Sequence, residues 1–215
     1  MSSATRERLL KAAEELFGEY GFDATSVRAI GERAGVNPAL VHYYFGSKVN
    51  LLAALLAQRS TALRATLWAA SRAEPMDLWD RLRVVLEAYM RAFYDHHLLV
   101  RLVFRELALR QRPELTEALV QLIEPLREPL YAILSEGVHR GRFHPVDPDL
   151  VWLTVMGALL MPLVNRPMAS ALFGWEPGSL EPYPEAFRAR LHRHLWDTLK
   201  AMLHPPGARG SPYGC

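Results

Sequence analysis

Apolar residues recur at helical spacing along most of the chain. Near the amino terminus one helical face collects Leu9, Leu10, Ala13, Leu16 and Phe17. Thr5 can cap this helix, and Gly21 can end it in a left-handed conformation. Runs of alternating β-branched residues between tight-turn pairs, the mark of strands, do not occur. The pattern therefore predicts an all-α fold.

Two short helices follow in quick succession. The first is capped by Thr25 or Ser26 and ends at Gly35. The second begins at the Asn37-Pro38 pair, because Asn accepts free amide hydrogens and Pro at the first helical position loses no bond, and it runs to about residue 45. A much longer helix then extends from about residue 47 towards residue 68. Four helix starts thus fall within the first 50 residues.

Beyond residue 70 the periodicity predicts five further helices, which brings the total to about nine. They cover residues 76–96, 98–110, 113–139, 148–164 and 184–203. Pro125 and Pro129 interrupt the third of these, where each removes a backbone hydrogen bond, so we expect a kink or a split there. Residues 165–182 are rich in turn formers and predict an irregular connection.

Composition narrows the class of protein. Of the 215 residues, 50% are hydrophobic and 22% are charged, which is typical of a globular chain. The single cysteine, Cys215, excludes an intramolecular disulfide and favours a reducing compartment. The chain opens without an apolar leader, and its most apolar stretch, residues 150–164, is too short to span a bilayer. We therefore expect a cytoplasmic protein without a membrane partner.

Catalytic and metal chemistry find little support in the sequence. The pairs His96-His97 and His192/His194 are spaced so that their side chains diverge on a helix. A Gly-x-Ser-x-Gly elbow, a His-Glu-x-x-His motif and a phosphate-cradling glycine loop are all missing. We expect no enzyme, no cofactor and no metal site.

The two short helices form a helix-turn-helix candidate around the turn at residues 34–36. Val36, Val41 and Phe45 can pack inward, which leaves an outward face made of Pro38, Ala39, Leu40, His42 and Tyr43. Such a face suits a helix that reads base edges in the major groove. Residues 25–48 carry a charge of +2, but residues 1–50 balance six basic against six acidic side chains. One domain alone would bind DNA weakly, so useful affinity requires two copies.

The run from Thr5 to Leu52 resembles the amino-terminal domain of the TetR (tetracycline-repressor) family of bacterial transcription regulators. It reads TRERLLKAAEELFGEYGFDATSVRAIGERAGVNPALVHYYFGSKVNLL and contains the family's Phe-x-x-x-Gly-Phe, Thr-Ser-Val-x-x-Ile-x-x-x-Ala-Gly-Val and Tyr-Phe-x-Ser-Lys segments. The rest of the chain is similar to the family only in length and helical character.

The resemblance implies roles for ten residues. Thr25, Ser26 and Arg28 would contact the DNA backbone, and Lys48 would clamp a phosphate. The positions that would face the DNA from the second short helix are Asn37, Pro38, Ala39, Leu40, His42 and Tyr43. The chain has His42-Tyr43-Tyr44 where many members have Tyr-His-Tyr or Tyr-Tyr-His, and Leu40 offers at most a contact with a thymine methyl group.

The resemblance also implies a homodimer on a palindromic operator in double-stranded DNA. Residues 1–50 would form the DNA-binding domain, residues 51–204 a helical effector-binding and dimerisation domain, and residues 205–215 a flexible tail. The helix at 148–164 is apolar nearly all round, and the final helix carries a second apolar stripe. Together they would form a four-helix dimer interface; the alternative is that both are ordinary core helices.

Members of the family usually hold a small-molecule effector between the middle helices. Candidate pocket residues are Trp68, Trp79, Tyr89, Phe93, Phe104, Arg105, Trp152 and Met156. Each of them could instead serve packing, and Arg105 could pair with Glu106 or face solvent. The favoured function is a dimeric repressor released from DNA by an unidentified effector. The alternative is a ligand-binding or protein-interaction module whose helix-turn-helix is only structural.

Overall fold

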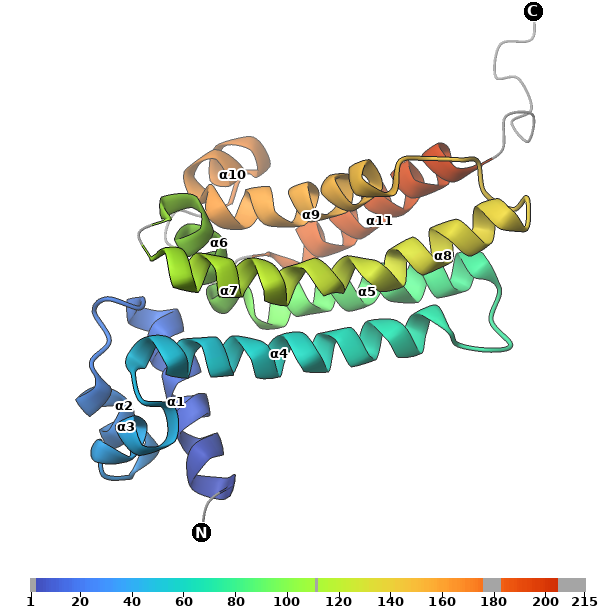
Figure 1. The fold of residues 1–215 in the computed structure, drawn as a ribbon. Coiled ribbons are helices and arrows are strands. Elements are labelled where there is room, and N and C mark those ends of the chain that lie inside the picture. Colours follow the sequence, from blue (N-terminus) through green and yellow to red (C-terminus); the bar gives the residue numbers. More distant parts are fainter. Residues whose placement is uncertain (1–2, 111, 176–182, 205–215) are drawn as a thin grey trace, which may run out of the picture. The chain divides into compact units, whose positions relative to one another are not determined.

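The computed structural model describes residues 3–110, 112–175 and 183–204, and over these residues the chain is helical, without strands (Figure 1). The predicted all-α fold is confirmed. The helices are α1 (Ser3–Tyr20), α2 (Val27–Ala34), α3 (Ala39–Phe45), α4 (Lys48–Ser71), α5 (Leu78–Asp95), α6 (His97–Leu109), α7 (Pro113–Ile123), the 3-10 helix η1 (Glu124–Arg127), α8 (Glu128–His139), α9 (Pro148–Val164), α10 (Arg166–Phe173) and α11 (Glu185–Leu203).

The described part of the chain contains eleven α-helices, two more than the nine that were expected. The first results from the predicted split: α7 ends at Ile123, and η1 separates it from α8. The second is a correction, because α10 occupies the start of the expected irregular connection. Asn165 caps α10 by accepting the amide hydrogen of Met168 at 3.2 Å, and Pro167 sits in its first turn. Asn and Pro are turn formers, but they also start helices. The expected flexible tail, 205–215, lies outside the described residues.

The chain divides into two compact units. Unit 1 contains Met1–Leu63 and His96–Leu126, so α6 and α7 belong with α1, α2 and α3. Unit 2 contains Arg64–Asp95 and Arg127–Cys215, and α4 contributes residues to both units. This division follows which segments pack together and does not test which residues bind DNA. The predicted boundary at residue 50, between the DNA-binding domain and the effector-binding domain, therefore stays a prediction.

The core of unit 1 joins the helix-turn-helix to α4, α6 and α7. It contains Phe17 of α1, Ile30 of α2 and Phe45 of α3, which are all buried. Apolar residues of α6 and α7, Leu99, Leu102, Val103, Leu115 and Leu119, belong to the same cluster. The hydrophobic stabilisation of the short helices therefore depends on chain segments more than 50 residues away.

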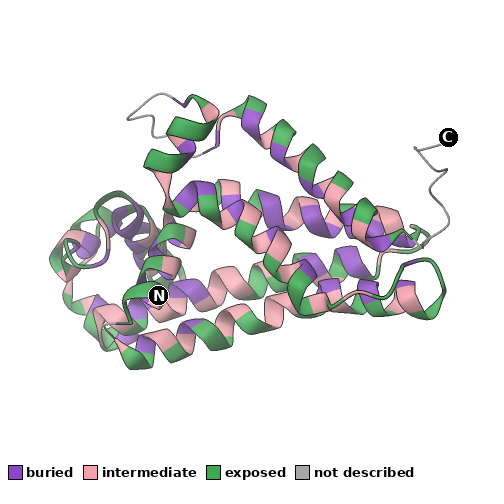
Figure 2. Ribbon diagram, turned by 90° about the horizontal axis from the view of Figure 1, so that it is seen from above, coloured by how far each residue is buried: buried purple, intermediate pink, exposed green. Residues whose placement is uncertain are grey.

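In unit 2, helices α5, α8, α9, α10 and α11 pack together. Buried residues recur along one face of its long helices (purple in Figure 2). The apolar stripe of α11 is part of this core, since Phe187, Leu191, Leu195, Leu199 and Leu203 are all buried. These five side chains are covered by their own subunit, while Trp196 and Met202 of the same helix are half-buried, and a contact of α11 with a partner stays a prediction.

Helix α9 has two apolar faces. Val151, Val155, Leu159 and Leu163 are buried in unit 2. On the other side of the helix an apolar row faces outward and consists of Leu150, Leu153, Met161 and Val164. We call this row the α9 outer face. Among the described residues no single helix is long and apolar enough to cross a bilayer; α9 and α10, bent by 97°, meet the length and composition test only as a pair.

Candidate nucleic-acid interface

Local hydrogen bonds fix the ends of α2 and α3. The Ser26 hydroxyl oxygen accepts the amide hydrogen of Ala29 at 3.0 Å, which caps α2. Gly35 ends α2 with a φ of 64°, a left-handed conformation that favours glycine. The Asn37 side-chain oxygen then accepts the amide hydrogen of Ala39 at 2.9 Å at the start of α3. The two hydrogen bonds and the left-handed glycine confirm the predicted start and stop signals.

The outward face of α3 is only partly as predicted. Val41 and Phe45 are buried, and Ala39, His42 and Tyr43 are exposed, as expected; Tyr43 is 78% exposed. Pro38 and Leu40 are half-buried instead, and Leu40 packs against the core of unit 1. The seven-residue helix is short, so its flanks touch neighbouring segments and only a narrow ridge stands in solvent. That ridge consists of Ala39, His42 and Tyr43.

The aromatic side chains of α3 are held in defined positions. The rings of Tyr43 and Tyr44 meet edge to face with their centroids 5.0 Å apart. His42 Nδ1 lies 3.0 Å from the carbonyl oxygen of Gly46, within hydrogen-bonding distance. The ridge therefore projects a preset ring geometry, which lowers the conformational entropy lost on binding.

Thr25 does not present its side chain to solvent. The residue is 3% exposed, and its hydroxyl lies within hydrogen-bonding distance of the carbonyl oxygens of Leu16 (3.1 Å) and Gly21 (2.7 Å). A hydroxyl used in this way ties the loop at residues 21–26 to the end of α1. The Thr25 hydroxyl is therefore engaged within unit 1, and a contact of this residue with the DNA backbone stays a prediction.

Lys48 has a structural role of its own. Its ammonium group donates hydrogen bonds to the carbonyl oxygens of Phe22 and Thr25, each at 2.8 Å, and lies 4.4 Å from the centre of the Phe22 ring. Burial lowers the pKa of Lys48 from its ordinary value. Two of its three N–H groups are engaged in holding the 21–26 loop, which leaves one for a phosphate.

Ser26 and Arg28, which complete the predicted backbone contacts, are both exposed. Arg28 forms an ion pair with Glu32 at 2.8 Å, one helical turn away on α2. Surface pairs of this kind contribute little stability and exchange partners readily. The guanidinium is therefore accessible to an anion.

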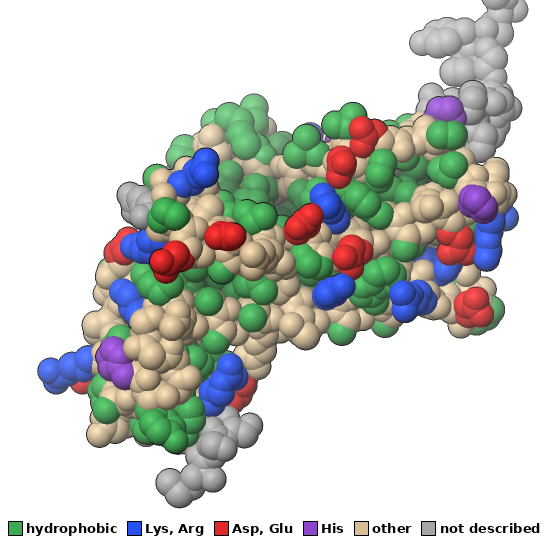
Figure 3. All heavy atoms as spheres, in the orientation of Figure 1, with side chains coloured by type: hydrophobic (Ala, Val, Ile, Leu, Met, Phe, Trp, Pro, Cys, Tyr) green, Lys and Arg blue, Asp and Glu red, His purple; other side chains and the backbone are tan. Residues whose placement is uncertain are grey.

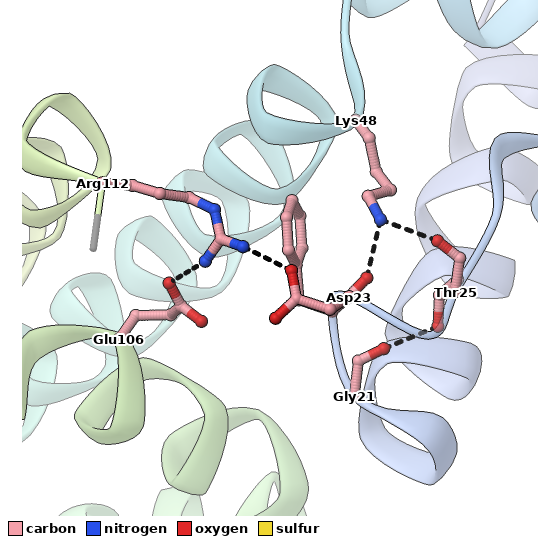
Figure 4. A network of polar contacts seen from close by, with 7 residues as sticks. Gly21, Asp23, Thr25, Lys48, Glu106 and Arg112 are labelled. Carbon is pink, nitrogen blue, oxygen red and sulfur yellow. Dashed lines mark hydrogen bonds and ion pairs between the residues drawn. The ribbon is translucent and has the colours of Figure 1, made fainter. Parts of the chain in front are cut away.

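A polar network at the 21–26 loop was not predicted (Figure 4). Arg112, which precedes α7, pairs with Glu106 of α6 at 2.6 Å and with Asp23 of the loop. Its guanidinium also lies 4.8 Å from the centre of the Phe22 ring. Arg112 and Asp23 are 89 positions apart, so sequence periodicity carries no signal for the pair.

Helix α1 is fastened to its neighbours in unit 1 by charged side chains. Arg8 donates to the carbonyl oxygen of Gly35 at 3.0 Å, and Arg33 pairs with Glu15 at 3.2 Å. Burial acts to raise the pKa of the Glu14 carboxyl, but hydrogen bonds from His96 and Arg59 outweigh burial and lower that pKa to about 2. These contacts join α1 to α2, to α4 and to His96 before α6.

Surface charge around the site is mixed. In Figure 3, Lys and Arg side chains are scattered among Asp and Glu side chains on the visible face. This agrees with the formal net charge of +2. Any affinity for DNA must come from a few placed groups, because a general excess of positive charge is not available.

The eight predicted effector-pocket residues are divided between the two units. Phe104 and Arg105 belong to unit 1, and the other six belong to unit 2. Trp79 packs on Phe143, with ring centroids 4.7 Å apart, and Tyr89 packs on Trp152 at 5.2 Å. Phe93 is buried, Trp68 lies 4.2 Å from the guanidinium of Arg72, and Met156 is half-buried on α9. Arg105 is exposed, while Glu106 pairs with Arg112.

Unit 2 contains a cavity at another place. It has a volume of about 360 Å³ and lies between α9, α10 and α11. Met161, Leu172 and Phe187 contribute to its apolar wall, and Arg190 and His194 of α11 also line it. None of the eight predicted residues lines this cavity. Over the described ranges, no three or more His, Cys, Asp or Glu side chains are grouped to hold a metal ion.

A short, capped helix with an exposed aromatic ridge, packed on a second helix across a glycine turn, is the architecture of a helix-turn-helix DNA-binding protein. The family models agree. The chain matches "Bacterial regulatory proteins, tetR family" over residues 9–55 and "Tetracyclin repressor-like, C-terminal domain" over residues 79–198. The chain therefore belongs to the TetR family and is a helix-turn-helix transcriptional regulator.

Three similar proteins illustrate the relationship. The HTH-type regulator RutR of Escherichia coli K12 is 30% identical over 156 residues, which cover 70% of this chain and 71% of RutR. The probable HTH-type regulator YttP of Bacillus subtilis is 26% identical over 184 residues, or 85% and 87% of the two chains. The TetR family regulator PfmR of Thermus thermophilus superposes with a TM-score of 0.66 at 25% identity, over 92% of this chain and 100% of PfmR.

Proposed function

We propose that this regulator is a homodimeric repressor that binds a palindromic operator and leaves it when a small molecule occupies the C-terminal part of the chain. The observation that carries the proposal is the exposed ridge of α3, a helix that is capped at its start and buried on its other side in the core of unit 1. The protein acts by binding and not by catalysis. Because its target is bacterial DNA, we place it in the cytoplasm.

The proposed contacts with DNA divide by chemistry. Ser26 and Arg28 are assigned to the phosphates, together with the remaining N–H of Lys48. Base edges and sugars would be met by Asn37, Ala39, His42 and Tyr43, with Pro38 and Leu40 at the margin of the ridge. The deeply buried Thr25 is left out of the set. We keep residues 1–50 as the DNA-reading segment and residues 51–204 as the effector and dimer segment.

The α9 outer face supports the proposed dimer. Leu150, Leu153, Met161 and Val164 expose a continuous apolar row that a two-fold partner helix would cover. Gly157 lies in the same row, and a Cβ atom placed there would meet no atom within 4 Å. A glycine facing open space lets a second helix approach closely. Half-sites on DNA would then be about one helical turn apart.

The cavity between α9, α10 and α11 supports the proposed effector site. Its volume of about 360 Å³ is at the lower end of the range for small-ligand sites. Apolar walls with Arg190 and His194 at one side suit a compact apolar ligand that carries an anionic group. Such a ligand releases DNA only if it binds more tightly to the conformation that fits the operator poorly.

Capture of genomic DNA by the purified protein tests the DNA-binding part. Fragments that the wild type retains are sequenced, and one is used to compare Tyr43→Ala with Tyr20→Ala. Both tyrosines are exposed in unit 1, but only Tyr43 lies on the ridge of α3. We expect Tyr43→Ala to weaken binding at least about tenfold and Tyr20→Ala to leave it unchanged. Equal binding by both variants would favour a purely structural helix-turn-helix.

A further inference from the structure

Asp23 places a negative charge beside the proposed phosphate contacts. Its carboxylate is 65% exposed and belongs to the loop that leads into Ser26 and Arg28. An unpaired carboxylate at this position would repel the DNA backbone. It would also offset the attraction of the positively charged Lys48 for a phosphate. The loop therefore needs a counter-charge for the interface to work.

Arg112 supplies that counter-charge from a distant part of the sequence. Glu106, which is only 4% exposed, accepts a hydrogen bond from one terminal guanidinium nitrogen of Arg112. The other terminal nitrogen donates a hydrogen bond to Asp23 (Figure 4). A buried carboxylate has no alternative partner in water, so Glu106 fixes the position of the guanidinium. The contact with the Phe22 ring fixes its orientation as well.

We propose that Arg112 is a positioning residue of the DNA interface: it neutralises Asp23 and anchors the 21–26 loop to the turn between α6 and α7. The inference rests on the proposed DNA-binding function. It adds a residue from the region matched by the C-terminal family model to the machinery that reads DNA. A displacement of the turn between α6 and α7 would then move Arg112, and through it the 21–26 loop that leads into α2.

The first measurement needs no DNA. Amide hydrogen exchange of the full-length chain, followed by mass spectrometry, compares wild type with Arg112→Gln over residues 21–34. We expect this segment to exchange at least about fivefold faster in the variant, because the loop loses its anchor. Arg101→Gln, which changes an exposed arginine of α6 outside the network, is the matched control and should match wild type. Unchanged exchange in Arg112→Gln would overturn the anchoring role whether or not DNA is bound.

The second measurement separates charge from position. On a fragment retained by wild type, Arg112→Gln should bind about tenfold more weakly, and Asp23→Asn added to it should recover most of this loss while fast exchange persists. Wild-type affinity in Arg112→Gln, or no recovery in the double variant, would disprove the neutralising role. If Arg112→Gln fails to fold because Glu106 is left unpaired, Glu106→Gln/Arg112→Gln replaces it as the background, with the same expected outcomes.

Discussion

Gly31 of α2 packs directly against Pro38 at the start of α3. A Cβ atom at Gly31 would lie 2.7 Å from the Cα atom of Pro38, which is closer than real Cβ contacts occur. The two helices of the DNA reader are therefore as near to each other as their backbones allow. This contact sets how far the ridge of α3 projects from α2.

Gly31→Ala should therefore displace α3. We expect a loss of about 1–3 kcal/mol in the free energy of unfolding, measured with urea, because two of the three nearest atoms, the Cα and N of Pro38, belong to the backbone and the third to its rigid ring. DNA affinity should fall as well, at temperatures where the variant is folded. Thr61→Ala, at an exposed position of α4, is the control, since alanine favours a helix and this side chain lies in solvent. Equal stability of the two variants would contradict the close packing.

Thr25→Val should destabilise the fold without weakening DNA binding by the folded protein. Removal of the hydroxyl leaves the carbonyl groups of Leu16 and Gly21 without their donor, at a cost of about 1–3 kcal/mol. Thr25→Ser keeps the hydroxyl and should retain most of the stability. Thermal unfolding and DNA titration at low temperature measure the two effects separately. A tenfold loss of DNA affinity in folded Thr25→Val would restore the direct contact.

Gly157→Asp should dissociate the proposed dimer. A Cβ atom at this position has open space around it, so the subunit should fold, but a charge would enter the apolar contact. Analytical ultracentrifugation should show at least about a tenfold rise in the dimer dissociation constant. Ala132→Asp, at an exposed position of α8, is the control. A dimer unaffected by Gly157→Asp would place the interface elsewhere.

Acid should weaken unit 1 through Glu14. Its pKa is about 2 in the folded protein against 4.5 for the unperturbed group, so its contribution is fully present above pH 4.5 and is lost as the pH falls towards 2. Glu14→Gln should lose up to about 3 kcal/mol at neutral pH and show a flatter dependence of stability on pH below 4.5. Urea unfolding at several pH values measures this. Glu117→Gln, at an exposed position of α7, removes one carboxylate without touching the contacts of Glu14 and is the control.

The cavity of unit 2 should bind a compact aromatic anion. We expect anilinonaphthalene sulfonate to fluoresce on binding. Ala158→Trp should weaken binding of the dye about tenfold, because the larger side chain fills part of the cavity. Leu150→Ser, on the α9 outer face and away from the lining, is the control for binding to exposed apolar surface. Equal fluorescence in wild type and Ala158→Trp would show that the dye binds elsewhere.

The sequence predicted those parts of the fold that depend on neighbouring residues. Ser26, Gly35 and Asn37 act within four residues of their partners, so their capping and turn signals could be recognised directly. Periodicity also identified the apolar stripe of α11, but a stripe does not reveal whether its own subunit or a partner covers it. Contacts between remote segments, such as Arg112 with Asp23, leave no local pattern.

The candidate site shows the same limit. Thr25 and Lys48 were correctly placed next to the DNA-reading helices, but the sequence could not show that the loop itself uses their polar atoms. The effector candidates were chosen for aromatic character, and Trp79 and Tyr89 are engaged in ring packing. Aromatic side chains at helical spacing serve packing as readily as ligand binding.

The shared core of unit 1 limits how this regulator can be dissected or recombined. A fragment that stops after α4 would expose the apolar side chains that Leu102, Leu115 and Leu119 normally cover, and it would tend to aggregate. A chimera that transplants the DNA specificity of this protein onto another sensor must therefore carry residues 96–126 along with residues 3–63. Transfer of the operator preference therefore requires two separate segments of the coding sequence.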